Sequence, residues 1–384
     1  MANKKNIKRI IITTAASVGV AALVLMVLAA SFFGVILLRT NTVPQYGTGI
    51  RSTENSFHTD LQAGFLNDKY YWRISPYSSG ERELSRPMPV TVGWDQGEPN
   101  VNYTVRISED ASMDEYMTYS FDGGQPTEIY NLKLGTTYYC GIYDDLGMPM
   151  AAIEILTTDA QAPRNMYVDG VTNVRDLGGW SIPDGRVKQG LIYRCGRLNE
   201  NNCETPVAKI TEKGIDTMLN EMKVRSEIDL RKVEDNEVGG LSDTSILGDS
   251  VNYYQCPMGY NGNMLIGNAD MVRHIFSDIL SKEENYPIIF HCSIGTDRTG
   301  MLAFLIGGLL GVDINDLYRD YLFSNFGDIG GSRSVINITF NYVTTIELTK
   351  GKDLSEKIEN YLLSIGVTRE EIESVRRILS EKAE

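Results

Sequence analysis

The pattern of hydrophobic and polar positions divides the chain into three parts. Residues 10–38 carry no charged side chain, and they predict a helix long enough to span a bilayer. Residues 57–159 contain short runs in which apolar and polar side chains alternate, which predicts β-strands. From residue 160 onward, strand-like runs alternate with segments of helical period, which predicts an α/β domain with helices flanking a central sheet.

Basic residues indicate how the first part is oriented. Four of them precede the apolar run, namely Lys4, Lys5, Lys8 and Arg9, and such charges stay on the cytoplasmic side of a membrane. We therefore expect residues 1–39 to form a cytoplasmic tip and a single-pass signal anchor in the cell membrane, with the remaining chain on the extracellular side. A signal peptide cleaved near Ala30 is the alternative, and it would make the protein secreted. The apolar run continues to Leu38, which favours the anchor.

The second part follows a polar linker at residues 40–56. Its predicted strands, separated by turn residues, cover 89–94, 101–108, 117–121 and 137–143, a spacing typical of an all-β sandwich. Residues 132–138 resemble a strand-start motif of fibronectin type III domains, although Leu134 stands where proline is usual. The resemblance implies that Tyr138 forms a tyrosine corner and that Trp94 lies in the core. Such a domain is either a spacer or a surface for a glycan or a partner protein.

The third part, residues 160–384, contains the clearest helical and strand signals. Its predicted strands cover 226–231 and 287–290, and its predicted helices cover 211–222, 268–282, 301–310, 314–325, 354–363 and 369–379.

One stretch between a predicted strand and a predicted helix carries the candidate chemistry. Residues 291–300 have the sequence His-Cys-Ser-Ile-Gly-Thr-Asp-Arg-Thr-Gly. The backbone N–H groups of a loop that enters a helix form a nest for an anion, and the helix N-terminus adds partial positive charge. We expect Cys292 to be a thiolate at the bottom of this nest. We expect the planar guanidinium of Arg298 to hold two phosphate oxygens.

This stretch resembles the signature loop of the cysteine-dependent tyrosine phosphatases. The resemblance implies that Cys292 is the nucleophile, that a cysteinyl-phosphate forms, and that Arg298 with the amides of residues 293–298 stabilises the transferring group. His291 would orient the loop, and Thr299 would donate a hydrogen bond to the Cys292 sulfur. The expected substrate-binding residues are His291, Ser293, Ile294, Gly295, Thr296 and Thr299.

Further motifs point to a narrower family. The segments 173–179, 193–196, 228–231 and 320–325, together with the loop, resemble bacterial atypical tyrosine phosphatases, which include dual-specificity and phosphoinositide-hydrolysing enzymes. The resemblance implies that Asp297, directly before the Arg, is the general acid, because a carboxyl beside a bound phosphate is best tolerated when it is protonated. Asp229 and Asp235 are the alternative acids. Two positions depart from the family, because Thr296 stands where Lys is usual and Cys195 where Ser is usual.

Two arginines of these motifs have structural interpretations. We expect Arg175 to pair with Asp176 in a glycine-rich turn. Arg194 either lines the pocket or packs against the sheet.

Composition narrows the functional classes. The formal net charge of −14 argues against a nucleic-acid partner, which requires a basic surface. Three histidines without ligand spacing give no metal site, and no cofactor is implied. The leading hypothesis is a metal-independent phosphatase for phosphotyrosine in proteins, with dual specificity as an extension. A phosphatase for phosphoinositides or inositol phosphates is the alternative, which the missing cation at Thr296 disfavours. A non-catalytic surface binding or adhesion protein is the third.

Overall fold

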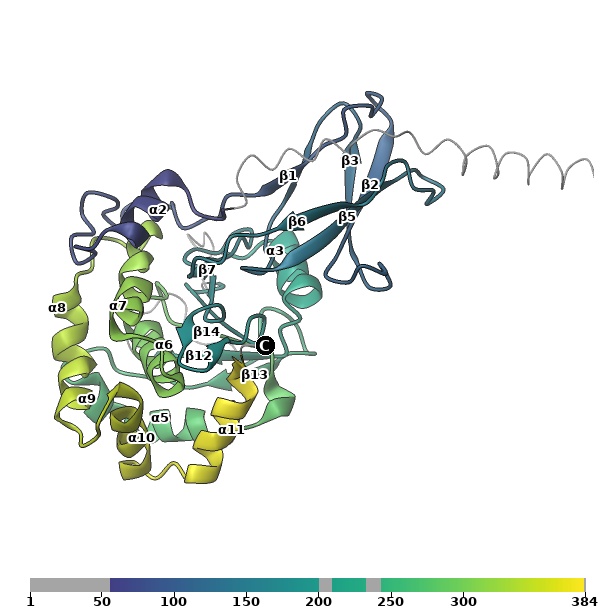
Figure 1. The fold of residues 1–384 in the computed structure, drawn as a ribbon. Helices are drawn as coiled ribbons and strands as arrows, with labels where there is room; N and C mark the ends of the chain where they lie inside the picture. The colour runs from purple at the N-terminus through teal and green to yellow at the C-terminus, as the bar shows by residue number, and fades with distance from the viewer. Residues whose placement is uncertain (1–55, 200–208, 233–242, 383–384) are drawn as a thin grey trace, which may run out of the picture. The chain divides into compact units, whose positions relative to one another are not determined.

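A computed structural model describes residues 56–199, 209–232 and 243–382 of the chain (Figure 1). Within these ranges no helix is both long enough and apolar enough to cross a bilayer. The predicted anchor at residues 10–38 and nearly all of the predicted linker lie outside the described residues. The described chain falls into two compact units, one containing residues 92–127 and 138–156 and the other containing the rest.

The first unit is built of antiparallel strands. Its sheet has the order β3-β2-β5-β6, with β2 at Asn102–Ser108, β3 at Met117–Asp122, β5 at Thr137–Tyr143 and β6 at Glu154–Thr157. A separate two-stranded sheet joins β1 (Val90–Val92) to β4 (Thr127–Ile129), and most of its residues belong to the second unit. Alternate side chains of β2 and β5 are buried, among them Val105, Ile107 and Cys140, and the Trp94 and Tyr103 rings meet edge to face at 5.1 Å. The four predicted strands are confirmed, while the fibronectin likeness stays a prediction.

The second unit contains a six-stranded sheet with the order β13-β12-β14-β11-β8-β7. Strands β11, β12, β13 and β14 run parallel, and β8 and β7 continue the sheet antiparallel. The strands cover Arg164–Asn165 (β7), Arg175–Asp176 (β8), Ile192–Cys195 (β11), Ser226–Asp229 (β12), Asn252–Gln255 (β13) and Ile288–His291 (β14). A small sheet joins Ser181–Ile182 (β9), Gly185–Val187 (β10) and Ser380–Lys382 (β15). The parallel strands end at one edge of the sheet, where ligands of α/β folds bind.

Helix α6, Asp297–Leu310, is the central helix of this unit. It is apolar on all sides, and every residue from Arg298 to Leu310 is buried, as expected of a helix surrounded by protein. It packs against α7 (Ile314–Phe323), α10 (Leu354–Ser364), α11 (Arg369–Leu379) and strands β11 and β14. The α6 prediction was four residues short at its start, because the helix begins inside the signature loop.

The remaining helices are short. They cover Asp60–Asn67 (α2), Glu212–Asp216 (α3), Met264–Gly267 (α4), Ala269–His274 (α5), Val335–Ile338 (α8) and Thr344–Leu348 (α9), with single turns of other helix types at Thr217–Glu221 (η1), Ile275–Leu280 (η2), Glu283–Asn285 (η3), Ser324–Phe326 (η4) and Thr339–Val343 (η5). The helices predicted at 211–222 and 268–282 are therefore α3 with η1 and α5 with η2. The α/β class with helices around a central sheet is confirmed.

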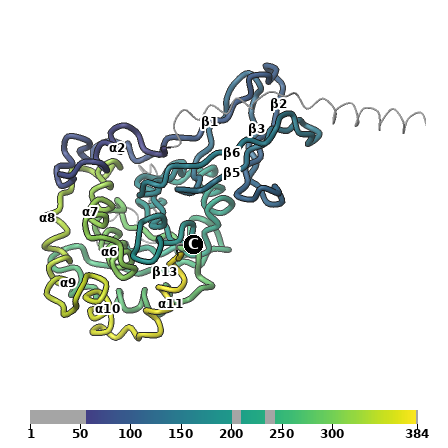
Figure 2. Tube along the Cα trace, in the orientation of Figure 1, coloured from purple at the N-terminus to yellow at the C-terminus, as the bar shows by residue number. Residues whose placement is uncertain are grey.

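The boundary between the units differs from the expected one. Residues 57–91 and 128–137, predicted as part of the β domain, belong to the α/β unit. A capping box formed by Thr59 and Gln62 begins helix α2, and Phe65 and Leu66 of that helix are buried in the core of the α/β unit. Figure 2 shows this purple segment beside the green helix α7. Burial of these apolar side chains gives the segment its place in the α/β unit.

Candidate active site

Strand β14, the signature loop and helix α6 follow one another without an intervening residue. Strand β14 ends at His291 and helix α6 begins at Asp297, so residues 292–296 make the turn between them. Gly295 has a φ of 68°, and a Cβ there would lie 2.3 Å from the carbonyl oxygen of Cys195. Only glycine fits this left-handed position so close to another backbone.

The carbonyl groups of the loop are held by donors from other parts of the sheet. The Ser293 carbonyl accepts from the Arg197 amide at 3.1 Å. The Asn173 side-chain amide donates to the carbonyls of Ile294 at 3.2 Å and Gly295 at 3.1 Å. The Arg194 guanidinium also donates to the Gly295 carbonyl, at 2.7 Å. Three consecutive carbonyls are therefore fixed by groups behind the loop.

The backbone N–H groups of the loop, unlike its carbonyls, have no hydrogen-bond partner in the described chain. Within the described chain, the N–H groups of Ser293, Ile294, Gly295 and Thr296 donate to no protein group. Peptide groups whose carbonyls are tied to one side present their N–H groups to the other, which is the arrangement of an anion nest. The N-terminus of the fourteen-residue helix α6 adds its partial positive charge at the same place. The arrangement can bind a phosphate group.

Cys292 lies under this nest with 2% of its surface exposed. Burial acts to raise the pKa of its thiol, but the charge of Arg298 and the hydroxyl and amide of Thr299 outweigh burial and the nearby Asp297. The pKa of Cys292 is therefore lowered from its ordinary value. The buried Thr299 hydroxyl has no nitrogen or oxygen partner in the described part of the chain, so it remains available to the sulfur.

Arg298 is oriented by backbone groups at the carboxyl edge of the sheet. Its Nη1 donates to the carbonyls of Leu230 at 3.2 Å and Met258 at 3.4 Å. The ring of Tyr260 lies 5.1 Å from the guanidinium, and this tyrosine is 42% exposed. The guanidinium is thus buried, fixed in direction and covered by an exposed aromatic ring.

His291 belongs to a buried cluster of charges beneath the loop. Its Nε2 lies 2.9 Å from Glu227 Oε1, and its Nδ1 lies 3.8 Å from Asp229 Oδ1. Burial acts to lower the pKa of His291, but the two carboxylates outweigh it, so the pKa is raised. Burial likewise acts to raise the pKa of Asp229, but His291 and Arg231 outweigh it and lower the pKa. His291 therefore anchors the strand before Cys292 to strand β12, consistent with an orienting role.

The same three side chains form a grouping that the sequence did not suggest. The ligand atoms of Glu227, Asp229 and His291 lie within 4.8 Å of one another, close enough to hold a metal ion. However, Arg231 donates to both oxygens of Asp229, and the imidazole shares a proton with Glu227. These hydrogen bonds already occupy the atoms that would bind a metal ion. The three side chains and Arg231 therefore form a cluster of ion pairs that needs no further partner.

A second buried network supports the loop from the other side. Asp320 accepts from Arg175 at 3.1 Å and pairs with Arg194, and Arg175 also pairs with the side-chain oxygen of Asn173. Burial, followed by the charge of Arg194, lowers the pKa of Arg175 to about 10. The expected pair of Arg175 with Asp176 is wrong, because Asp176 pairs with Arg164 at 2.7 Å. Arg194 is fully buried behind the loop, where it contacts the Gly295 carbonyl.

Asp297 is at the first position of helix α6 and is partly exposed. Its carboxylate accepts from the hydroxyl of Tyr321 at 3.0 Å and from Nε of Arg333 at 3.4 Å. Of the alternative acids, Asp229 is buried and bound to Arg231, and Asp235 lies outside the described residues. Thr296 is buried, with its hydroxyl 3.3 Å from the Ile294 carbonyl.

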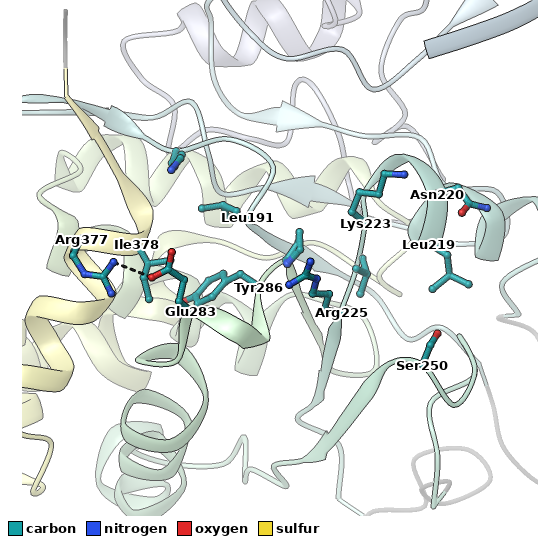
Figure 3. Close-up of a pocket in the computed structure, with 13 residues that line it drawn as sticks. Leu191, Leu219, Asn220, Lys223, Arg225, Ser250, Glu283, Tyr286, Arg377 and Ile378 are labelled. Atoms are coloured by element: carbon teal, nitrogen blue, oxygen red, sulfur yellow. Dashed lines mark hydrogen bonds and ion pairs between the residues drawn. The ribbon is translucent and has the colours of Figure 1, made fainter. Parts of the chain in front are cut away.

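A cavity of about 820 Å³ lies elsewhere in this unit (Figure 3). It is lined by residues that precede the parallel strands, including Leu191 before β11, Arg225 before β12 and Pro287 before β14. It therefore lies at the amino edge of the sheet, opposite Cys292, and shares no residue with the predicted site. Arg377 and Glu283 at its wall form an ion pair at 3.0 Å.

A family model described as the tyrosine phosphatase family matches residues 166–381, which is more than half of the chain. The chain belongs to this family. The match contains the signature loop and every motif segment on which the resemblance was based, and it confirms the expectation of a tyrosine phosphatase domain.

Individual relatives are distant. A Cupriavidus necator protein named provisionally as a tyrosine-protein phosphatase is 24% identical over 191 residues, covering 43% of this chain and 64% of the relative. The chain therefore spans less than two thirds of that relative. The catalytic core of the PP-IP phosphatase SIW14 from S. cerevisiae is 17% identical, with a TM-score of 0.29, and the match covers 42% of this chain and 86% of the other. TpbA from P. aeruginosa, in complex with pTyr, is 14% identical, with a TM-score of 0.30 and coverages of 46% and 86%.

The sequence marks the signature loop but not most of the residues that support it. Asn173 and Asp320 lie inside motif segments. The sequence therefore marked their positions but did not show which groups they contact. Glu227 carried no signal, because one acidic residue in a strand is indistinguishable from a surface residue until the strand order is known. Contacts made across neighbouring strands depend on that order, since residues 64 positions apart meet in the His291–Glu227 pair.

We predict that Thr299 sets part of the thiolate character of Cys292. Replacing Thr299 with Ala removes the hydroxyl that lowers the pKa of Cys292. Because a lowered pKa keeps the thiolate down to lower pH, the midpoint of iodoacetate labelling against pH should move upward in this variant. Thr299→Ser, which keeps the hydroxyl, should remain near the wild-type midpoint. Equal midpoints for Thr299→Ala and wild type would contradict the assignment.

Proposed function

We propose that the protein hydrolyses phosphotyrosine in proteins without a catalytic metal ion, through a cysteinyl-phosphate. One observation carries this proposal: a thiol with a lowered pKa lies beneath backbone amides that donate to no protein group in the described chain, and beside a fixed guanidinium. These groups supply a nucleophile and electrostatic stabilisation of a transferring phosphoryl group.

The chemistry follows in two steps. The Cys292 sulfur attacks phosphorus, and the bond from phosphorus to the tyrosyl oxygen breaks while Arg298 and the loop amides hold the equatorial oxygens. The leaving oxygen takes a proton from Asp297. A water molecule then attacks phosphorus, returning a proton to Asp297, and the bond between sulfur and phosphorus breaks to release inorganic phosphate and the thiolate. Thr299 stabilises that thiolate through its hydroxyl.

The surroundings of Arg298 favour an aromatic phosphoester. The exposed Tyr260 ring lies beside the guanidinium that would hold the phosphate, so it can pack against a tyrosyl ring as aromatic pairs do. Inositol phosphates carry several phosphate groups and require further cations. Thr296 stands where Lys is usual in the family that the loop resembles, and it is buried and supplies no cation.

The place of the enzyme in the cell is a separate part of the proposal. The charge pattern of residues 1–39 supports a membrane anchor, with the phosphatase outside the cytoplasm, or a secreted protein if the segment is cleaved. The strand pattern of residues 92–127 and 138–156 supports a fibronectin type III-like spacer or a surface for a partner.

The function is tested with the full chain and a panel of substrates in the presence of EDTA. We expect turnover of a phosphotyrosine peptide, much less of the same peptide with phosphoserine, and none by Cys292→Ser. Turnover of inositol phosphates alone would replace the proposed substrate class. Binding of tungstate without turnover of any substrate would instead favour a non-catalytic binding protein.

A second prediction concerns Asp297 as the proton donor. Asp297→Asn keeps the shape of the side chain but cannot give a proton, so hydrolysis of phosphotyrosine peptides should slow by about 10²- to 10⁴-fold. Aryl phosphates with activated leaving groups need no proton and should slow far less. Asp328→Asn, at an exposed position, is the control and should match wild type. Equal slowing on both kinds of substrate would remove Asp297 from this role.

A further inference from the structure

The segment of residues 56–91, here called the strap, precedes the β domain and lies outside the family match. Its helix α2 and the turns that follow belong to the α/β unit. Phe65, Leu66, Tyr71 and Ile74 of the strap are buried in the core of that unit, and the Phe65 ring meets the Phe326 ring at 5.8 Å. The strap is therefore packed as part of the phosphatase unit rather than as a linker.

Backbone contacts place the strap against a motif that supports the loop. The hydroxyl of Ser78 and the amide of Gly80 both donate to the Asn325 carbonyl, the latter at 2.9 Å. The Leu84 amide donates to the Phe326 carbonyl at 2.5 Å. Asn325 ends the motif that begins with Asp320, the carboxylate shared by Arg175 and Arg194.

The strap also contacts the residue that holds the loop. Ser85, which is 3% exposed, accepts from the backbone amide of Asn173 at 3.0 Å through its Oγ. Asn173 is fully buried and has a φ of 61°, a left-handed position that needs such support. Its side chain donates to the carbonyls of Ile294 and Gly295 in the signature loop. Ser85 is thus connected to the loop through the hydrogen bonds of a single residue, Asn173.

Glu83 fixes the geometry of this connection. One of its carboxylate oxygens accepts from both the amide and the hydroxyl of Ser85, at 2.9 and 2.5 Å. The other accepts from the hydroxyl of Thr172, the neighbour of Asn173. Glu83 therefore determines where the Ser85 hydroxyl points and joins the strap to the turn that carries Asn173.

We propose that the strap completes the active site, with Ser85 and Glu83 as positioning residues that act on the loop through Asn173. This inference rests on the proposed function and extends it beyond the residues of the family match. In chain order it makes the β domain an insertion into the phosphatase unit rather than a domain placed before it. Because a displacement of about 1 Å at a reacting group can cost about 10²-fold in rate, loss of this connection should reduce turnover measurably.

The test uses three variants of the full chain, assayed with an aryl phosphate and by iodoacetate labelling against pH. Ser85→Ala should lower kcat by about 10- to 100-fold and move the labelling midpoint upward, because the loop no longer holds its donors around the sulfur. Glu83→Ala should shift both quantities in the same direction. Ser79→Ala is the matched control, because the hydroxyl of this exposed strap serine donates to the exposed Glu81, at 3.5 Å, and in the described residues makes no hydrogen bond to Asn173 or the loop.

The outcomes separate this inference from the proposed function. Wild-type kcat and labelling midpoints in Ser85→Ala and Glu83→Ala would overturn the inference. If thermal unfolding shows that one of these variants has lost its fold, the result for the other variant decides the test. A wild-type chain without turnover would refute the proposed function, while the labelling midpoints would still report whether the strap acts on the loop.

Discussion

The active site depends on the direction in which three peptide groups of one loop point. Asn173, Arg194 and the Arg197 amide hold the carbonyls of residues 293–295 from behind. If these carbonyls turned toward the sulfur, the site would present negative partial charges to a phosphate and would destabilise a thiolate. The side chains of Asn173 and Arg194 are buried, so their orientation is kept by their own partners rather than by solvent.

The partners of those donors explain why charged side chains are buried around the loop. Asp320 lies between Arg175 and Arg194, and breaking such a buried pair leaves an uncompensated charge, at a typical cost of about 3–5 kcal/mol. Beneath the loop, Glu227 and Asp229 hold His291 in the same way. The two networks connect the loop and the strand before it to strands β8, β11 and β12 and to helix α7, and so fix its position. Cys292 and Arg298 can then remain close together in a protein interior, where neither charge would be stable alone.

Local signals predicted the loop, the helices of the C-terminal half and the class of the fold. Alternation of strand and helix patterns, and the spacing of Cys292 and Arg298, depend only on neighbours in the chain. The strap could not be predicted in this way, because Ser85 and Asn173 are 88 residues apart and are separated in sequence by the β domain. The pair of Arg175 with Asp320 was missed for the same reason, since 145 residues separate the two. Asp176, the sequence neighbour of Arg175, was the expected partner, but in the folded sheet it pairs with Arg164.

The central claim is that the amides of the signature loop are the anion-binding groups. The most direct measurement is the change in backbone amide chemical shifts of the ¹⁵N-labelled full chain when tungstate is added. The account predicts that the largest shifts fall on residues 293–298. It also predicts that Arg194→Ala, which removes one of the two donors to the Gly295 carbonyl, reduces them. Shifts confined to the basic cavity at the opposite edge of the sheet, with the loop unchanged, would contradict it.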